Sequence, residues 1–402
     1  MENRLDVYFS KVFCRTRHKT QLFSGEIDDH YHTRLQHTLE VEEIALSIAK
    51  QLNATNPDME CDLKKVSLIS LLHDIGHTPF GHAGERGLHD ILSGKDCEKY
   101  GLPDFRKLGI AIGFKHNINS GLLYSENCRF DRIDSDILDG IVKHSKLRYC
   151  EDGLDYGFEY IFHGYSNSYA ESSKTVEGFI VANADEIAQI CSDYIDLCLG
   201  TQSGTSTIKN NVTISKHIGT FSDDERTNAK EICDCLTSAF IASFCKQKKS
   251  CNFDNNEFSI IVKELKDAIS EYVKNNNDIK EYDLKHEDKI KALFAFYYKK
   301  PEELTNDFFG DFVYRAKRIH YRKATISILI KDTLASDRDE VKKIIDWIYK
   351  EITKSDKFLS VNTRSDYQTI LRLYNRSLAV HISKMTDNFA EHKYKKYLDT
   401  TK

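Results

Sequence analysis

The sequence has few of the features that break helices, span membranes or mark secretion. Only four prolines occur in 402 residues, and because proline interrupts helices, this scarcity favours a largely helical chain. No apolar run approaches the roughly 20 residues that cross a bilayer, so we expect no membrane partner. The opening residues, MENRLDVYFS, do not have the basic segment and following apolar segment of a signal peptide.

Cysteine and charge patterns exclude further classes. The eleven cysteines are scattered without a paired CxxC framework, so reduced thiols in a cytoplasmic protein are the simplest prediction. The net charge of -5 gives no overall support for nucleic-acid binding. A local basic stretch, YRAKRIHYRK at 314–323, could still contact a polyphosphate or a single strand of DNA, although a solvated helix face is the simpler explanation.

Helical periodicity runs through most of the chain, and we predict an all-α fold. The segment 34–52 would bury Leu35, Leu39 and Ile44, together with Ile48 and Leu52. A second helix is predicted at 62–77, closed by Gly76 and Pro79, and a third at 173–199.

The remaining segments complete the predicted organisation. We expect a loop or lid at 143–172, a strand or loop at 201–215, and amphipathic helices within 223–298 and 310–398. With no repeat and no clear linker, the chain would divide into a catalytic core at 1–240 and a helical region at 241–402. The second region would serve regulation or oligomerisation.

Ionisable side chains interrupt three of the predicted apolar helices. His73 and Asp74 end the helix at 62–77, His37 lies on the inward side of 34–52, and Asp185 stands within VANADEIAQI. Burying such groups costs several kcal/mol unless hydrogen bonds or an ion compensate. Each alone is more simply a satisfied core residue. Together, two imidazoles and two carboxylates form a ligand set for a divalent ion, Mn or Mg first, with Fe, Zn, Ni and Co as alternatives.

A longer motif strengthens this interpretation. The string HDIGHTPFGHAGE at 73–85 occurs with RTRHKTQLF, RLQHTLEV, GFKHNINS, DGIVKH and ANADEIAQICSDYIDL. In this order the segments resemble the HD-domain dNTP triphosphohydrolases of the bacterial dGTPase type. The matches run from about residue 15 to 196, with a weaker one at 384–395, and residues 200–380 add little.

The resemblance assigns roles to the ionisable residues. It implies that the metal ligands are His37, His73, Asp74 and Asp185. His82 and Glu85 would be a catalytic histidine and its carboxylate partner, three residues apart after Gly81, with His82 as general acid. His116 would be a further catalytic histidine, and His77 would have a supporting role.

The resemblance also implies a nucleotide site. Arg34 would contact the triphosphate, Gln21 and Asp193 would bond the sugar 3'-hydroxyl, and Leu22 would crowd the 2' position.

Two positions depart from the family pattern. Gln189, at a substrate-binding position, replaces the usual tyrosine, and Glu186 stands where some relatives have lysine. Both departures concern contact with sugar and phosphate rather than the metal ligands.

We therefore expect metal-dependent hydrolysis of dNTPs, dGTP among them, to deoxynucleoside and inorganic triphosphate. Three alternatives stay open. They are an HD phosphohydrolase acting on another nucleotide phosphate ester, a nucleic-acid-binding or nuclease relative, and a non-catalytic scaffold. Besides the dNTP, the resemblance implies further copies of the chain, a nucleotide activator or single-stranded DNA as partners. Base preference, native metal and oligomeric state are not fixed by the sequence.

Overall fold

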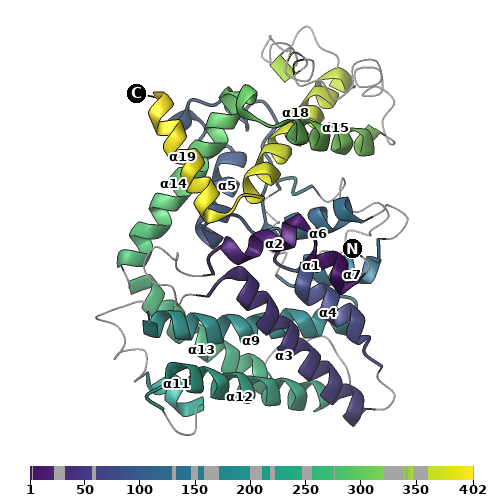
Figure 1. Ribbon diagram of the computed structural model, residues 1–402, viewed down its shortest axis with the longest axis vertical. Coiled ribbons are helices and arrows are strands. Elements are labelled where there is room, and N and C mark those ends of the chain that lie inside the picture. The colour runs from purple at the N-terminus through teal and green to yellow at the C-terminus, as the bar shows by residue number, and fades with distance from the viewer. Residues whose placement is uncertain are drawn as a thin grey trace. The chain divides into compact units, whose positions relative to one another are not determined.

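The computed structural model describes residues 1, 3–21, 32–56, 60–128, 133–145, 153–157, 172–199, 211–217, 222–246, 256–275, 277–320, 339, 343, 345–346 and 361–401. Within these residues every regular element is a helix, and the β pairing consists of isolated bridges, Thr20 with Thr33 and Ile112 with Asp155. The predicted all-α fold is confirmed (Figure 1). Among the described helices none is long and apolar enough to cross a membrane.

Two compact units alternate along the chain. The first comprises Met1–Gly81, His116–Tyr149 and Ser168–Leu284, and the second comprises His82–Lys115, Cys150–Asn167 and Lys285–Lys402. The functional division at residue 240 stays a prediction. Because segments of the two units alternate along the sequence, no single boundary residue separates the compact units.

The first unit is a helical bundle organised around α9 (Val176–Leu199). This helix is apolar on several sides, with Ile180, Ala184, Ile187 and Ile190 among its buried residues, which suits a central position. Packed against it are α3 (Arg34–Thr55), α4 (Leu63–Leu72), α7 (Ser135–Lys143), α12 (Glu225–Lys246) and α13 (Glu257–Asn275) (Figure 1). The unit also contains α1 (Arg4–Tyr8), α2 (Lys11–Cys14), η1 (Arg15–His18), α6 (His116–Asn127) and α11 (Val212–His217).

The buried face of α3 differs from the predicted apolar stripe. Leu39 is 44% exposed and Leu35 is only half-buried, whereas Arg34 and His37 are buried. The helix turns these polar side chains inward because they take part in a polar cluster described below. Hydrophobic periodicity located the helix, and His37 lies on its inward side as predicted, but Leu39 is not part of the buried face.

Two predicted boundaries also need correction. The helix predicted at 62–77 ends at Leu72, and the chain then makes turns up to Gly76. Part of the segment predicted as strand or loop at 201–215 is helical, because α11 begins at Val212 after the Asn211 side chain accepts bonds from two backbone N–H groups. Residues 201–210 and most of the loop predicted at 143–172 lie outside the described residues.

The second unit contains the helices that follow α14 (Asn277–Lys299), a helix that itself begins in the first unit. These are η5 (Pro301–Glu303), α15 (Asn306–His320), α18 (Val361–Ser383) and α19 (Asp387–Thr401), and the unit also holds α5 (Gly81–Leu92) from His82 onward and η2 (Glu98–Tyr100). In the basic stretch at 314–323, Arg315 is buried with its guanidinium 3.8 Å from Asp311. Residues 321–323 lie outside the described chain.

Candidate metal centre

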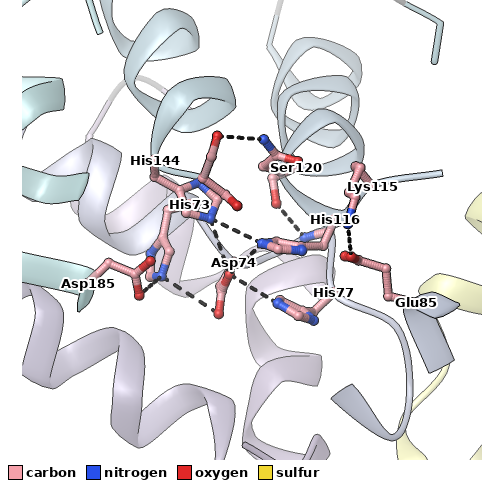
Figure 2. Close-up of polar contacts among 12 residues, drawn as sticks. His73, Asp74, His77, Glu85, Lys115, His116, Ser120, His144 and Asp185 are labelled. Carbon is pink, nitrogen blue, oxygen red and sulfur yellow. Dashed lines mark hydrogen bonds and ion pairs between the residues drawn. The ribbon is translucent and has the colours of Figure 1, made fainter. Parts of the chain in front are cut away.

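The turn after α4 places the carboxylate of Asp74 among four imidazoles of the first unit (Figure 2). Its Oδ1 lies 3.5 Å from Nε2 of His77, 3.7 Å from Nε2 of His144 and 3.9 Å from Nε2 of His116. Its Oδ2 lies 3.7 Å from Nε2 of His73. All five side chains are buried.

The other two predicted ligands meet the same cluster. Nε2 of His37 lies 2.9 Å from Oδ1 of Asp185, and Nε2 of His73 lies 3.6 Å from the same oxygen. Donor atoms of His37, His73 and Asp74 all lie within 4.8 Å of one another. The structure thus brings the four predicted ligands together into a cluster that could hold a metal ion.

The orientation of His73 fits such an ion. Its Nδ1 donates a hydrogen bond of 2.6 Å to the carbonyl of Ser70, so that in the neutral ring Nε2 carries the lone pair. Within the described part of the chain, this buried Nε2 has no hydrogen-bond partner. Histidines that bind metals commonly fix their other nitrogen in this way, so the residues present fit the predicted metal.

The cluster is strongly coupled electrostatically. Burial acts to raise the pKa of Asp74, but His73, Arg34 and His116 outweigh it and hold the pKa well below its usual range. Burial acts to lower the pKa of His73, yet the carboxylates of Asp74 and Asp185 raise it to about 9. Burial, with the nearby charge of His73, lowers the pKa of His144 to about 4.

Arg34 contributes a buried guanidinium to this cluster. Its Nη1 lies 2.7 Å from Oδ2 of Asp74, and its Nε donates to the carbonyl of Thr20. Its buried Nη2 has no hydrogen-bond partner among the described residues, and Gly81, whose φ is +55°, lies beside it. Arg34, which is predicted to contact the triphosphate, therefore also forms an ion pair with Asp74, a predicted metal ligand.

Further candidate residues follow Asp185 along α9. Gln189 and Asp193 stand four and eight residues later, hence on one helix face, and both are half-buried. Burial, reinforced by the charge of Asp196, raises the pKa of Asp193 to about 7. At Glu186, the lysine of some relatives is absent, but Lys266 from α13 forms an ion pair with this carboxylate.

The segment before α3 carries two of the three predicted sugar contacts, Gln21 and Leu22. Gln21 is buried, and its Oε1 has no hydrogen-bond partner among the described residues. Its backbone N–H donates to the carbonyl of His32, whose ring nitrogen lies 2.7 Å from Asp196. Leu22 lies outside the described residues.

The predicted catalytic pair lies on α5. His82 is exposed at the start of this helix, and Glu85 is buried. Glu85 forms an ion pair of 2.8 Å with Lys115 (Figure 2). Both residues belong to the second unit, whereas the metal ligands belong to the first. Their joint catalytic role stays a prediction.

His144 is the residue of the cluster that sequence analysis did not single out. It directly follows α7, after the apolar stretch GIV and a lysine, much as His73 follows LISLL. A histidine at the end of an apolar helix was therefore a usable signal.

Close packing holds the turn after α4 against α6. The N–H of Gly76 donates to Oγ of Ser120, and Nδ2 of Asn119 donates to the carbonyl of Gly76. A Cβ atom at position 76 would lie 2.2 Å from the backbone nitrogen of Ser120. Only glycine fits there without moving backbone atoms.

Comparison with known proteins agrees with this geometry. Residues 34–189 match the HD domain family. A deoxyguanosinetriphosphate triphosphohydrolase-like protein of Desulfatibacillum aliphaticivorans is 35% identical over 195 residues, which cover 47% of this chain and 44% of that protein. A protein of the same name from Clostridium tetani is 32% identical over 200 residues, covering 49% and 45%.

The matched region spans less than half the length of these relatives. The HD match runs from Arg34 to Gln189 and includes all four predicted ligands of the cluster. Residues 34–189 are thus similar to HD domains, and about half of the chain is similar to part of the dGTP triphosphohydrolase-like proteins.

Proposed function

We propose that the protein is a metal-dependent phosphohydrolase that converts deoxynucleoside triphosphates, dGTP among them, into deoxynucleoside and inorganic triphosphate. The observation that carries the proposal is the convergence of His37, His73, Asp74 and Asp185 beside a buried arginine. The names of the relatives support the substrate class.

A divalent ion held by these four residues would polarise a phosphoryl oxygen and favour attack by water. The chain's own groups position the substrate. Nη2 of Arg34 has no hydrogen-bond partner within the described chain and could bind a phosphate oxygen, and guanidinium groups suit phosphate geometry. Gln21 and Asp193 would bind the 3'-hydroxyl, whose single proton goes either to Gln21 Oε1, which has no hydrogen-bond partner among the described residues, or to the Asp193 carboxylate.

The triphosphate carries several negative charges and needs more than one cation. Lys266 is a second candidate, because it lies against Glu186, the neighbour of a predicted metal ligand. The attraction of Glu186, Asp185 and Asp193 outweighs burial and raises the pKa of Lys266, which keeps the ammonium charged. Lys266 from α13 would thus replace the lysine that some relatives carry at the position of Glu186.

Loss of the nucleoside requires a proton at its 5'-oxygen, because an alkoxide is a poor leaving group. We assign this proton to His82, an exposed histidine at the start of α5. Glu85 would stabilise the protonated ring in the substrate complex.

The decisive experiment follows the products. Purified protein is incubated with each dNTP or with GTP, in Mn²⁺ or Mg²⁺, and the products are separated by anion exchange. We expect triphosphate and deoxynucleoside from a dNTP, with ¹⁸O from labelled water in the triphosphate. Pyrophosphate or monophosphate as the inorganic product would overturn the proposal, and Asp185→Ala serves as the inactive control.

Sugar selection has its own test. Leu22→Ala should narrow the dNTP-to-rNTP ratio of kcat/KM at least tenfold, about 1.4 kcal/mol, because the apolar wall at the 2' position is removed. Gln21→Ala should lower kcat/KM for both sugars. An unchanged ratio in Leu22→Ala would assign sugar selection to other residues.

We also propose that the protein associates with further copies of the chain, with a nucleotide activator or with single-stranded DNA. Analytical sedimentation of the protein alone, with dNTP and with an oligonucleotide measures these three associations.

A further inference from the structure

The short backbone segments 19–21 and 32–34 pair with each other and carry two residues that the proposed function assigns to the substrate, Gln21 and Arg34. The N–H of Gln21 donates to the carbonyl of His32 at 3.2 Å, and the N–H of Arg34 donates back to the first segment at 2.9 Å. Isolated two-stranded pairs are only marginally stable in water. The position of Gln21 therefore depends on what anchors His32.

His32 is anchored to two helices of the first unit, α9 and α3, which pack against each other (Figure 1). Its ring Nδ1 donates a 2.7 Å hydrogen bond to Oδ1 of Asp196 on α9, and its backbone N–H donates to the same oxygen at 3.4 Å. On the other side of the ring, Nε2 lies 3.5 Å from Oε1 of Glu40 on α3. His32 is 5% exposed and Asp196 is fully buried, so one buried carboxylate fixes both the backbone and the side chain of His32.

The contact between His32 and Asp196 is an ion pair. Burial acts to lower the pKa of His32, but its bonds to Asp196 and Glu40 outweigh burial and raise the pKa to about 9. Burial raises the pKa of Asp196, and His32 opposes that rise. Because Oδ2 of Asp196 has no hydrogen-bond partner among the described residues, this buried carboxylate depends on the charge of His32.

Asp196 lies on the face of α9 that carries the candidate site. It follows Asp193 by about one helical turn and Asp185 by about three turns, so the three carboxylates share one face of the helix. The link from Asp196 through His32 to Gln21 therefore brings Gln21 to that face. Gln21 and Asp193 are the two residues predicted to bind the same sugar hydroxyl.

We propose that His32 is a positioning residue for sugar recognition, which holds Gln21 through Asp196 so that the Gln21 amide meets the 3'-hydroxyl of the nucleotide. This role rests on the proposed function, because only a bound nucleotide gives Gln21 a partner. His32 acts through Gln21 and not by touching the substrate. Displacement of a positioned group by about 1 Å is enough to weaken such a contact strongly.

Dideoxynucleotides separate this role from a general loss of structure. We would measure kcat/KM for dGTP and for 2',3'-dideoxy-GTP in the wild type and in His32→Gln, which keeps a donor but removes the charge. His32→Gln should lower kcat/KM about tenfold for dGTP and little for the dideoxy substrate, which has no 3'-hydroxyl. His32→Arg, which restores a cation beside Asp196, should recover most of the loss. Equal losses for both nucleotides, or no loss for either, would overturn the proposal.

Further variants make the comparison sharper. In a Gln21→Ala background, His32→Gln should cause no further loss for dGTP, because the residue that it positions is already gone, and additive losses would contradict the proposal. His217→Gln is the matched control, since this histidine pairs with Glu264 elsewhere in the first unit, and it should leave both values unchanged. If His32→Gln does not fold by circular dichroism, Asp196→Ala removes the same anchor.

Hydrogen exchange tests the link without reference to activity. The N–H of Gln21, followed by mass spectrometry, should exchange faster in His32→Gln than in the wild type or in His217→Gln. Faster exchange in a protein that releases no triphosphate would support the link and refute the proposed function alone. Unchanged exchange in a protein that releases triphosphate would refute this inference alone.

Discussion

Buried charges serve different ends in the two units. In the second unit, Nζ of Lys291 bonds Asp90 at 3.0 Å and Asp96 at 2.6 Å. The guanidinium of Arg376 donates 2.8 Å bonds to the carbonyls of Gly113 and Asp155. These charges meet partners at ordinary hydrogen-bond distances, so their desolvation is offset within the protein.

In the first unit, Arg34 pairs with Asp74 at 2.7 Å and His37 with Asp185 at 2.9 Å, but other donor atoms of the metal centre face one another at longer distances. Asp74 meets four imidazole nitrogens at 3.5–3.9 Å, and His73 Nε2 and Arg34 Nη2 have no hydrogen-bond partners among the described residues. We infer that the paired buried charges of the second unit stabilise the fold. The incompletely hydrogen-bonded groups of the metal centre would instead bind a ligand. Substitutions in the two units should then affect different measurements.

The largest effect is expected at Asp185. Asp185→Ala should lose the metal and lower kcat/KM by more than about 10³-fold, since the predicted site loses a ligand, while the fold persists. Glu186→Ala, the next residue on α9, is the matched control and should keep its metal. Elemental analysis and thermal melts of both variants check this, and full occupancy in Asp185→Ala would remove Asp185 from the ligand set.

A smaller catalytic effect is expected on α5. His82→Ala should lower kcat by about 10²–10⁴-fold, the usual contribution of a general acid, with little change in KM or metal content. His89→Ala, a substitution on the same helix, should not lower kcat comparably. Steady-state kinetics decide, and a near-wild-type kcat in His82→Ala would require another proton donor.

The paired charges of the second unit should respond in stability instead. Lys291→Met leaves the partly buried Asp90 and Asp96 without their shared cation and should lower the free energy of unfolding by roughly 1–3 kcal/mol. The exposed pair of Lys99 and Asp288 provides the control, since Lys99→Met should cost under about 1 kcal/mol. Denaturant titration measures both, and equal losses would break the comparison between buried and exposed pairs.

The smallest effect concerns Asp193, whose pKa rises from 3.8 to about 7 on folding. The folded chain holds this proton more tightly than the unfolded chain, so stability falls as pH rises from about 4 to 7. Asp193→Asn should therefore gain about 1–2 kcal/mol at pH 8 and little at pH 4, while losing affinity for dNTP. A gain that is independent of pH would show that Asp193 does not titrate in this range.

The sequence predicted the four clustered residues because each is an ionisable side chain within or beside an apolar helix. It missed His144 because one histidine after an apolar run carries little weight until folding places it beside His116. Lys266 was missed for a similar reason, since residue 186 and α13 are distant in sequence and no local pattern joins them.

Helix faces were harder to predict than helix positions. Leu35 and Leu39 follow helical spacing, yet Arg34 and His37 occupy the buried side. Hydrophobic periodicity assumes that the core is apolar, and at this centre the interior is polar. Its failure at the start of α3 therefore coincides with the candidate site.

The contact of Gly76 with α6 determines how closely the donor atoms of the metal centre approach one another. One hydrogen atom in place of a methyl group lets the α4 turn, which carries Asp74, lie directly on the backbone that begins at His116. Gly76→Ala would force these two segments apart and lengthen the distance between the carboxylate and that imidazole. The spacing of the donor atoms is thus fixed by a residue with no side chain of its own.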